Sequence, residues 1–175
     1  GAEVIAKRSA ARAGSRLAIH AKDIPTEFPE AALKQARESE PAASEREDLT
    51  KTPLITIDPH DARDHDDAVF AEELSDGWRV IVAIADVAAY VTEGSALDQE
   101  ALKRGNSTYF PDRVVPMLPF ELSADACSLK EGELRRCIAV EMEFDKSGTK
   151  RKHRFIRGMM RSAAGISYEQ AQTAI

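Results

Sequence analysis

The chain has 175 residues, of which 43% are hydrophobic and 31% charged, and its 30 acidic and 24 basic side chains leave a net charge of −6. This composition excludes a wholly disordered chain, a collagen and a membrane-embedded protein, and the length suffices for one sizeable core. Taken over the whole chain, the negative charge argues against a nucleic-acid partner, because binding to phosphates requires lysine and arginine.

The first 52 residues predict a linker that contains one helix. Residues 1–22 are basic and show little hydrophobic periodicity, which indicates a frayed or incomplete element. Residues 30–40 are a good helix-forming run, which Pro41 ends. The polar residues after it are typical of a linker, so we expect a boundary at residues 41–52, with residues 1–52 preceding a domain that begins at residue 53.

The second part of the chain predicts a sheet. Its strands are expected over residues 53–58, 68–74, 78–87, 134–145 and 150–162. An Asp-Gly turn joins the second and third of them into a hairpin. Both alternating sets of side chains in residues 78–87 are apolar, so we expect this strand to be central and buried on both faces, with Trp78 in the core.

Cap and turn signals predict the remaining elements. Residues 94–107 predict a short helix, because Ser95 and Asp98 have the spacing of a capping box. Three prolines in residues 107–123 exclude both a helix and a central strand, which leaves an ordered, extended loop. Ser167 has the position of an N-cap residue for a last helix.

The cysteines and the hydropathy indicate the compartment. Cys127 and Cys137 have no metal-binding spacing, and two inert thiols in a reducing cytoplasm are the favoured interpretation, with a disulfide as the alternative. No run reaches 18 apolar residues, and the basic N-terminus lacks the apolar stretch of a signal peptide. We therefore expect a cytoplasmic protein that does not contact a membrane.

The most informative feature is a loop crowded with carboxylates, between residues 53–58 and 68–74. Five aspartates fall within ten residues, opposed by one arginine: Asp58, Asp61, Asp64, Asp66 and Asp67, with Arg63 among them. Two carboxylates about 5 Å apart repel by roughly 3 kcal/mol at an effective dielectric constant of about 20. A divalent cation would offset this repulsion, and oxygen ligands favour Mg²⁺, Mn²⁺ or Ca²⁺ over zinc. The alternative is a solvated acidic loop that binds no ion.

The spacing of the aspartates excludes an EF-hand, because neither Asp58 nor Asp64 as first ligand puts the required residues at the later positions. An open loop between two strands instead lets carboxylates converge on one or two ions. Positions on the metal then remain for phosphate and water, as two-metal hydrolysis of a phosphodiester requires.

The residues around this loop resemble a known family. ITIDPHDARDHDDAVF (55–70) resembles the signature of the catalytic domain of the ribonuclease II / ribonuclease R family of exoribonucleases. The resemblance continues through IADVAAYVTEGSALDQEALKRGNSTYFPDRVVPMLPFELSADACSL (84–129), and more weakly through MRSAAGISYEQA (160–171). Upstream, IPTEFPEAALKQA is similar to the segment that precedes the catalytic domain in this family.

The resemblance implies a fold, an activity and a metal site. Members of the family degrade single-stranded RNA from its 3′ end to nucleoside 5′-monophosphates, with Mg²⁺ as cofactor and Mn²⁺ as the alternative ion. The implied fold is α+β, with a mixed, mainly antiparallel sheet and flanking helices. The family's four metal-site aspartates correspond to Asp58, Asp64, Asp66 and Asp67, of which Asp66 is tied most directly to catalysis. The fifth carboxylate, Asp61, is interpreted as a loop residue.

The resemblance also assigns an RNA contact. Tyr109 corresponds to a tyrosine that stacks on a terminal base, and the alternative is a core aromatic, which is our interpretation of Phe110. Residues 146–161 hold seven basic side chains and no acidic one. These side chains predict either phosphate contacts or the solvated face of an edge strand, and both interpretations stay open.

The catalytic domain of the family is longer than this chain, so residues 53–175 are expected to be its N-terminal part. An incomplete domain exposes apolar surface, and we therefore expect the isolated chain to be prone to self-association. Activity of the isolated chain is not implied by the resemblance. The alternative function is a non-catalytic RNA-binding or regulatory module that retains the metal loop.

Overall fold

The structure, a computed structural model, describes the backbone of residues 2–175 and the side chains of residues 7 and 9–175. The chain folds as two compact units. Residues 1–39 and 91–120 form the first, here called the helical unit, and residues 40–90 and 121–175 form the second, here called the sheet unit. None of the described helices is long and apolar enough to cross a membrane.

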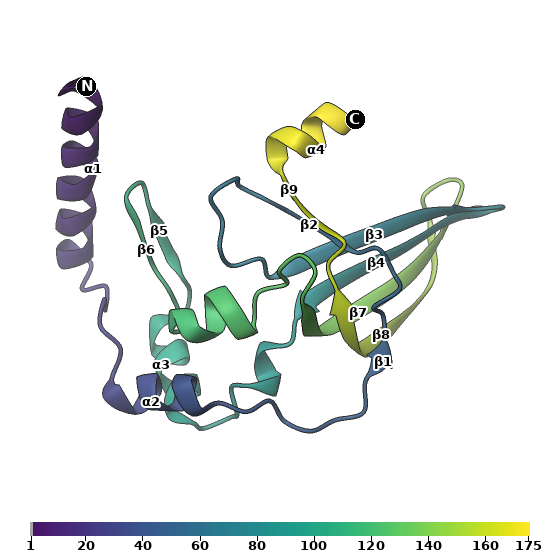
Figure 1. Cartoon of the computed structure of the whole chain (residues 1–175), viewed down its shortest axis with the longest axis horizontal. Coiled ribbons are helices and arrows are strands. Elements are labelled where there is room, and N and C mark those ends of the chain that lie inside the picture. The colour runs from purple at the N-terminus through teal and green to yellow at the C-terminus, as the bar shows by residue number, and fades with distance from the viewer. Residues whose placement is uncertain (1) are drawn as a thin grey trace. The chain divides into compact units, whose positions relative to one another are not determined.

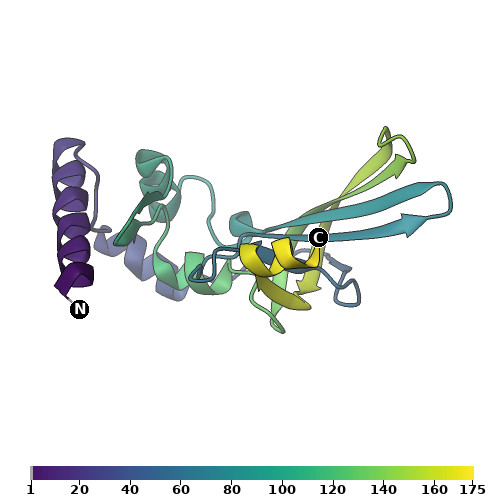
Figure 2. The same ribbon diagram turned by 90° about the horizontal axis from the view of Figure 1, so that it is seen from above.

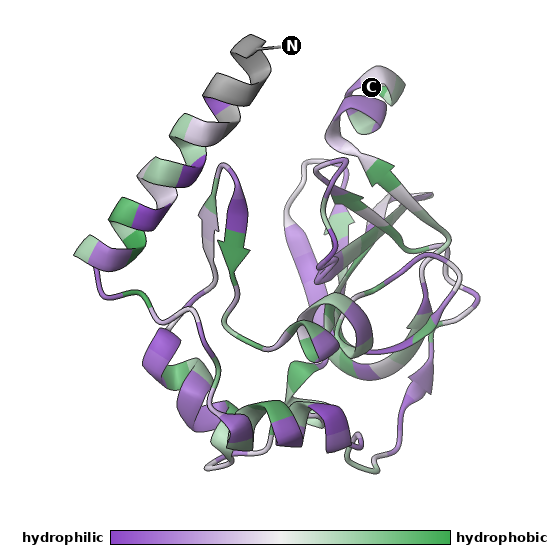
Figure 3. Cartoon of the chain, turned by 60° about the vertical axis from the view of Figure 1, so that its left-hand side comes forward, coloured by the Kyte–Doolittle hydropathy of each residue, from purple (hydrophilic) through white to green (hydrophobic). Residues whose placement is uncertain are grey.

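The helical unit begins with a helix that the sequence did not predict. Helix α1 covers Ala2–Ala21, where a frayed or incomplete element was expected. Alanine is the strongest helix former, and the alanines of this segment favour a helix without an apolar stripe. Figure 3 accordingly shows hydrophilic and hydrophobic residues mixed along the coloured part of α1.

Two short helices and a hairpin complete the helical unit. Helix α2 covers Glu30–Glu38 and α3 covers Ala96–Arg104, and Ser95 caps α3 by accepting a hydrogen bond from the Asp98 amide, which confirms both predicted helices. Strands β5 (Thr108–Phe110) and β6 (Arg113–Val115) form a two-stranded hairpin where an extended loop was predicted. The prolines are compatible with it because neither strand is central.

The side chain of Arg104 joins three segments of the helical unit. Its guanidinium lies 3.6 Å from the centre of the Phe28 ring and donates a 2.9 Å hydrogen bond to Glu100. It also donates to the carbonyl oxygens of Pro116 and Glu27, at 3.0 Å and 2.7 Å. The predicted loop and the segment before α2 are thereby fastened to the end of α3.

The sheet unit contains a seven-stranded sheet in the order β1-β8-β7-β4-β3-β2-β9 (Figure 1). Its strands are β1 (Glu47–Asp48), β2 (Ile55–Asp58), β3 (Asp67–Leu74), β4 (Gly77–Ala85), β7 (Leu134–Asp145), β8 (Lys150–Arg161) and β9 (Ala164–Ser167). Among the named strands, the β1–β8 and β2–β9 pairs are parallel and the other pairs of this sheet are antiparallel. The short helices Val87–Ala89 and Leu122–Ala126, with α4 (Tyr168–Ala174), complete this unit. The predicted α+β class with a mixed, mainly antiparallel sheet is confirmed.

The long hairpins β3–β4 and β7–β8 lie side by side through the β4–β7 pair (Figure 2). Strand β4 is central, as predicted, and one face of it is buried. The buried side chains of that face and its neighbours are Ala68, Ile81, Ala83, Cys137, Ala139 and Ile156. Both cysteines are free and buried, so the disulfide alternative does not hold, and burial raises the pKa of Cys127 to about 12 and that of Cys137 to about 11.

The other face of β4 is open, which corrects two predictions. Trp78 is 45% exposed rather than in the core, and Ile84 is exposed as well. The register places Trp78, Val80, Val82 and Ile84 opposite Phe144, Met142, Val140 and Ile138 of β7, so the whole row is apolar. Alternation of apolar residues identifies both faces of a strand, but it carries no information on whether another element packs against them.

Candidate metal centre

The acidic loop connects two neighbouring strands at one end of the sheet. Asp58 is the last residue of β2, Asp67 is the first residue of β3, and these strands pair antiparallel. Asp64 and Asp66 lie in the connection between them. The four aspartates predicted as metal ligands therefore all lie on one loop or at the strand ends that border it. Asp61 lies on the same loop and is exposed, as are Asp66 and Asp67.

Hydrogen bonds to main-chain groups of this loop hold it to the rest of the sheet unit. The amide of His65 donates to the hydroxyl of Ser128 at 3.1 Å, and that hydroxyl donates to the carbonyl of Arg63 at 3.2 Å. The Leu129 amide donates to the His65 carbonyl at 2.7 Å, and the Ala85 amide donates to the Asp66 carbonyl at 2.8 Å. The backbone on both sides of Asp64 is thus attached to other elements.

The carboxylates act on one another electrostatically. The pKa of Asp66 is raised, chiefly because the surrounding chain removes water from its carboxyl group, although the residue as a whole is exposed. Repulsion from Asp67, Asp64 and Asp58 raises this pKa further. Burial and the neighbouring carboxylates thus both raise the pKa of the residue that the resemblance ties most directly to catalysis.

His65 makes a contact that the sequence analysis did not identify. Its Nδ1 atom lies 2.7 Å from Oδ2 of Asp58, and both side chains are largely buried. The contact spans seven positions across an irregular loop, so no helical or strand periodicity signals it. The contact orients the side chain of Asp58 at the end of β2.

The four carboxylates have the chemistry of a site for a hard divalent cation, since oxygen donors are the ligands that Mg²⁺ and Mn²⁺ prefer. In the described part of the chain, no three His, Cys, Asp or Glu side chains stand close enough together to hold a metal ion as they are. The unrelieved repulsion at Asp66 fits carboxylates that an ion would draw together.

A pocket of about 440 Å³ adjoins this end of the sheet. It lies where β2 and β9 run parallel, with Asp58 opposite Ser167. Its lining consists of Pro59, His60, Gly165, Ile166, Ser167 and Gln170. The pocket is polar at its rim, because Ser167 and Gln170 form the capping box of α4.

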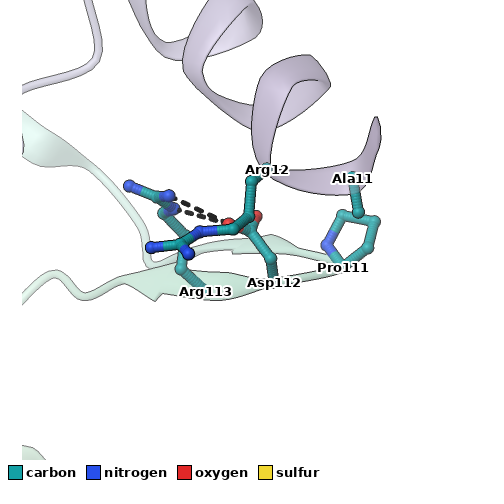
Figure 4. Close-up of a pocket in the computed structure, with 5 residues that line it drawn as sticks. All are labelled: Ala11, Arg12, Pro111, Asp112 and Arg113. Carbon is teal, nitrogen blue, oxygen red and sulfur yellow. Dashed lines mark hydrogen bonds and ion pairs between the residues drawn. The ribbon is translucent and has the colours of Figure 1, made fainter. Parts of the chain in front are cut away.

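Tyr109 belongs to the helical unit, in strand β5, opposite Val114. Its side chain is 64% exposed, so the alternative of a core aromatic does not hold. At the turn of the same hairpin, Asp112 accepts two hydrogen bonds from Arg113, which lower the pKa of Asp112 (Figure 4). A pocket of about 480 Å³ beside this pair is also lined by Ala11, Arg12 and Pro111, a juxtaposition that the sequence separation of the two segments conceals.

Three of the seven basic residues in 146–161 pair with acidic side chains. Arg154 bonds Glu47 at 2.8 Å and 2.9 Å, and it also bonds Glu141 at 2.8 Å. Arg151 pairs with Asp76, and Lys152 pairs with Glu143 at 2.9 Å. These partners favour a structural role for Arg151, Lys152 and Arg154, and both interpretations stay open for the rest of the stretch.

Comparisons with known proteins match most of the chain. The family described as the RNB domain matches residues 46–175. Ribonuclease R of Vibrio parahaemolyticus is 44% identical over 179 residues, which cover 99% of this chain and 21% of that protein. Ribonuclease R of Acidithiobacillus ferrooxidans is 43% identical over 173 residues, covering 96% of this chain and 39% of that protein. The chain therefore spans well under half the length of these curated relatives.

Solved structures show the same likeness. The RNase R of Mycoplasma genitalium in complex with double-stranded RNA has a TM-score of 0.85 at 31% identity, covering 89% of this chain and 29% of that chain. The same protein in complex with ribose methylated single-stranded RNA has a TM-score of 0.82 at 32% identity, covering 87% and 24%. Yeast Ssd1, described as a pseudonuclease, shares the fold alone, with a TM-score of 0.68 at 19% identity, covering 78% and 18%.

Proposed function

Because the chain belongs to the RNB domain family, we propose that the protein it comes from is a 3′-to-5′ exoribonuclease that hydrolyses single-stranded RNA to nucleoside 5′-monophosphates. The observation that carries the proposal is the presence of all four candidate metal ligands at one end of one sheet. The four residues are Asp58, Asp64, Asp66 and Asp67. A non-catalytic RNA-binding module, the alternative function, would be free to lose them.

In this proposal the four aspartates hold Mg²⁺, for which Mn²⁺ can substitute. A bound divalent cation supplies a Lewis acid that lowers the pKa of a water molecule and neutralises charge on phosphate. Four carboxylates offer enough oxygen atoms for two ions, and we propose that two ions take part in the hydrolysis. His65 keeps Asp58 oriented at the end of β2, and the pKa of Asp66 is raised by burial and by the three neighbouring carboxylates.

RNA is the proposed partner, and Tyr109 is its proposed stacking residue. The exposed ring on a hairpin supports this role, because a base can stack on a ring only where the ring face is accessible. Stacking does not depend on base identity, which suits an enzyme that removes every nucleotide in turn. The two Mycoplasma genitalium RNase R structures, in complex with single-stranded and with double-stranded RNA, support RNA as the class of ligand.

The remaining expectations are also part of the proposal. Residues 53–175 would form the N-terminal part of the catalytic domain, and residues 1–52 would precede it, a division close to the start of the family match at residue 46. A cytoplasmic location is supported by two buried, free thiols, which suit a reducing compartment. Self-association of the isolated chain is supported by the open apolar face of β4 and β7.

The test is Asp66→Asn in the full-length protein, because asparagine has nearly the size of aspartate but no charge. A 3′-labelled single-stranded RNA should still bind in a gel shift, while release of mononucleotides should fall by orders of magnitude. Asp61→Asn on the same loop is the matched control and should leave cleavage near the unaltered level. Full cleavage by the Asp66 variant would overturn the assignment, and binding without cleavage by the unaltered full-length protein would favour the alternative module.

A further inference from the structure

The hydroxyl of Ser128 touches the acidic loop on both sides of a proposed metal ligand. It accepts a hydrogen bond from the amide of His65 and donates one to the carbonyl of Arg63, so its two partners flank Asp64. The adjacent Leu129 amide donates to the His65 carbonyl at 2.7 Å. The main-chain groups of Arg63 and His65, on either side of Asp64, are thereby held.

The segment that holds the loop is itself rigidly placed. Ser128 is fully buried, and the side chains of Cys127 and Leu129 beside it are buried as well. The Ser128 carbonyl accepts a 2.9 Å hydrogen bond from Arg135 in β7. The Ser128 amide donates to the Asp125 carbonyl at 2.9 Å, within the short helix that precedes it. Movement of the loop away from Ser128 would therefore leave buried polar groups without partners, which is costly.

The charge on the loop makes such an attachment necessary. Without an ion, the carboxylates repel one another and favour an opened loop, in which they stand farther apart. The attachment through Ser128 opposes this opening by bonding main-chain groups of Arg63 and His65, and it uses no carboxylate oxygen of the loop. The side chain of Ser128 is separated from the loop by more than sixty positions in the sequence.

We propose that Ser128 is a positioning residue, whose buried hydroxyl holds the backbone of the acidic loop against the sheet unit, where a divalent cation can draw its carboxylates together. The inference rests on the proposed function for the identity of the ligand, but the attachment of the loop is independent of it. Ser128 touches neither metal nor RNA in this proposal and acts only through the backbone of residues 63–65.

The test compares Ser128→Ala with Ser162→Ala in the 175-residue chain. Ser162 is an equally buried serine whose hydroxyl donates to the Ala164 carbonyl at 3.0 Å, so its loss removes a similar hydrogen bond elsewhere in the sheet unit. Amide hydrogen exchange of residues 59–66 and the affinity for Mn²⁺, followed by the electron paramagnetic resonance of the free ion, are the two measurements. Ser128→Cys, which keeps the size but is a poor donor, gives a second variant if the alanine variant does not fold.

We expect Ser128→Ala to speed exchange in the loop and to weaken Mn²⁺ binding, each by about tenfold, while Ser162→Ala changes neither by more than about twofold. Equal loop exchange in the unaltered chain and the Ser128 variant would overturn the inference, as would equal losses in both serine variants. If the unaltered chain binds no Mn²⁺, the metal part of the proposed function fails, and the exchange measurement still decides the role of Ser128.

Discussion

Replacing Arg104 by alanine should destabilise the helical unit more than any surface arginine can. The Arg104 side chain is only 2% exposed, and its ion-pair partner Glu100 is buried with it. Loss of one member of a buried pair leaves an uncompensated charge and costs about 3–5 kcal/mol. The carbonyls of Pro116 and Glu27 lose their donor in the same variant, and the Phe28 ring loses its cation. The lower end of this range, about 3 kcal/mol, is already a large share of the stability of a typical domain.

The free energy of unfolding is measured by titration with guanidinium chloride, followed by far-ultraviolet circular dichroism. Arg37→Ala is the control. Arg37 also pairs with a glutamate, Glu30, at 2.6 Å, but both side chains are well exposed, so its loss should cost about 0–1 kcal/mol. In a Glu100→Gln background the Arg104 substitution should cost less, because no charge is left buried. Equal losses for the Arg104 and Arg37 variants would refute the reasoning.

Three further outcomes are expected. Mn²⁺ at a hundredfold excess over its dissociation constant should stabilise the chain by about 2.7 kcal/mol in thermal unfolding, and an unchanged melting temperature would contradict a metal site at Asp58, Asp64, Asp66 and Asp67. Tyr109→Ala in the full-length protein should weaken binding of single-stranded RNA by about 1–3 kcal/mol, whereas Tyr109→Phe keeps the ring and should bind normally; equal affinities of all three proteins would exclude stacking. Phe155 is 76% exposed on the open face, and a lysine there would add a charge to the apolar surface. Phe155→Lys should therefore shift the isolated chain towards monomer in sedimentation velocity. An unchanged distribution of species would place self-association on another surface.

Local signals predicted the elements that local interactions stabilise. The cap at Ser95 and the turn at Gly77 depend on residues within a few positions, and both helix α3 and the β3–β4 hairpin formed where they were expected. Strand β1 was missed because it consists of two acidic residues, which pair with Gly158 and Met159 over a separation of about 110 positions. No alternation can appear in an element of that length.

At the candidate site too, features that depend on neighbouring residues could be predicted, and contacts between distant residues could not. The aspartates of the loop are adjacent in the sequence, so their crowding and the need for a counter-charge could be predicted. The contacts that organise them could not: His65 meets Asp58 through an irregular loop, and Ser128 reaches the loop from a segment over sixty positions away. The exposure of Trp78 was equally unpredictable, because an apolar residue on a strand gives no indication of what covers it.

The parallel pairing of β2 with β9 has a consequence for the order in which the site can form. Strand β2 has a single register pair with β3, Ile55 with Val69, but four with β9, ending at Asp58 opposite Ser167. Most of the ladder that holds Asp58 therefore comes from residues that a ribosome adds about a hundred positions later. During synthesis the acidic loop emerges early and acquires its full support late, so a nascent chain carries the carboxylates well before it can hold them in place.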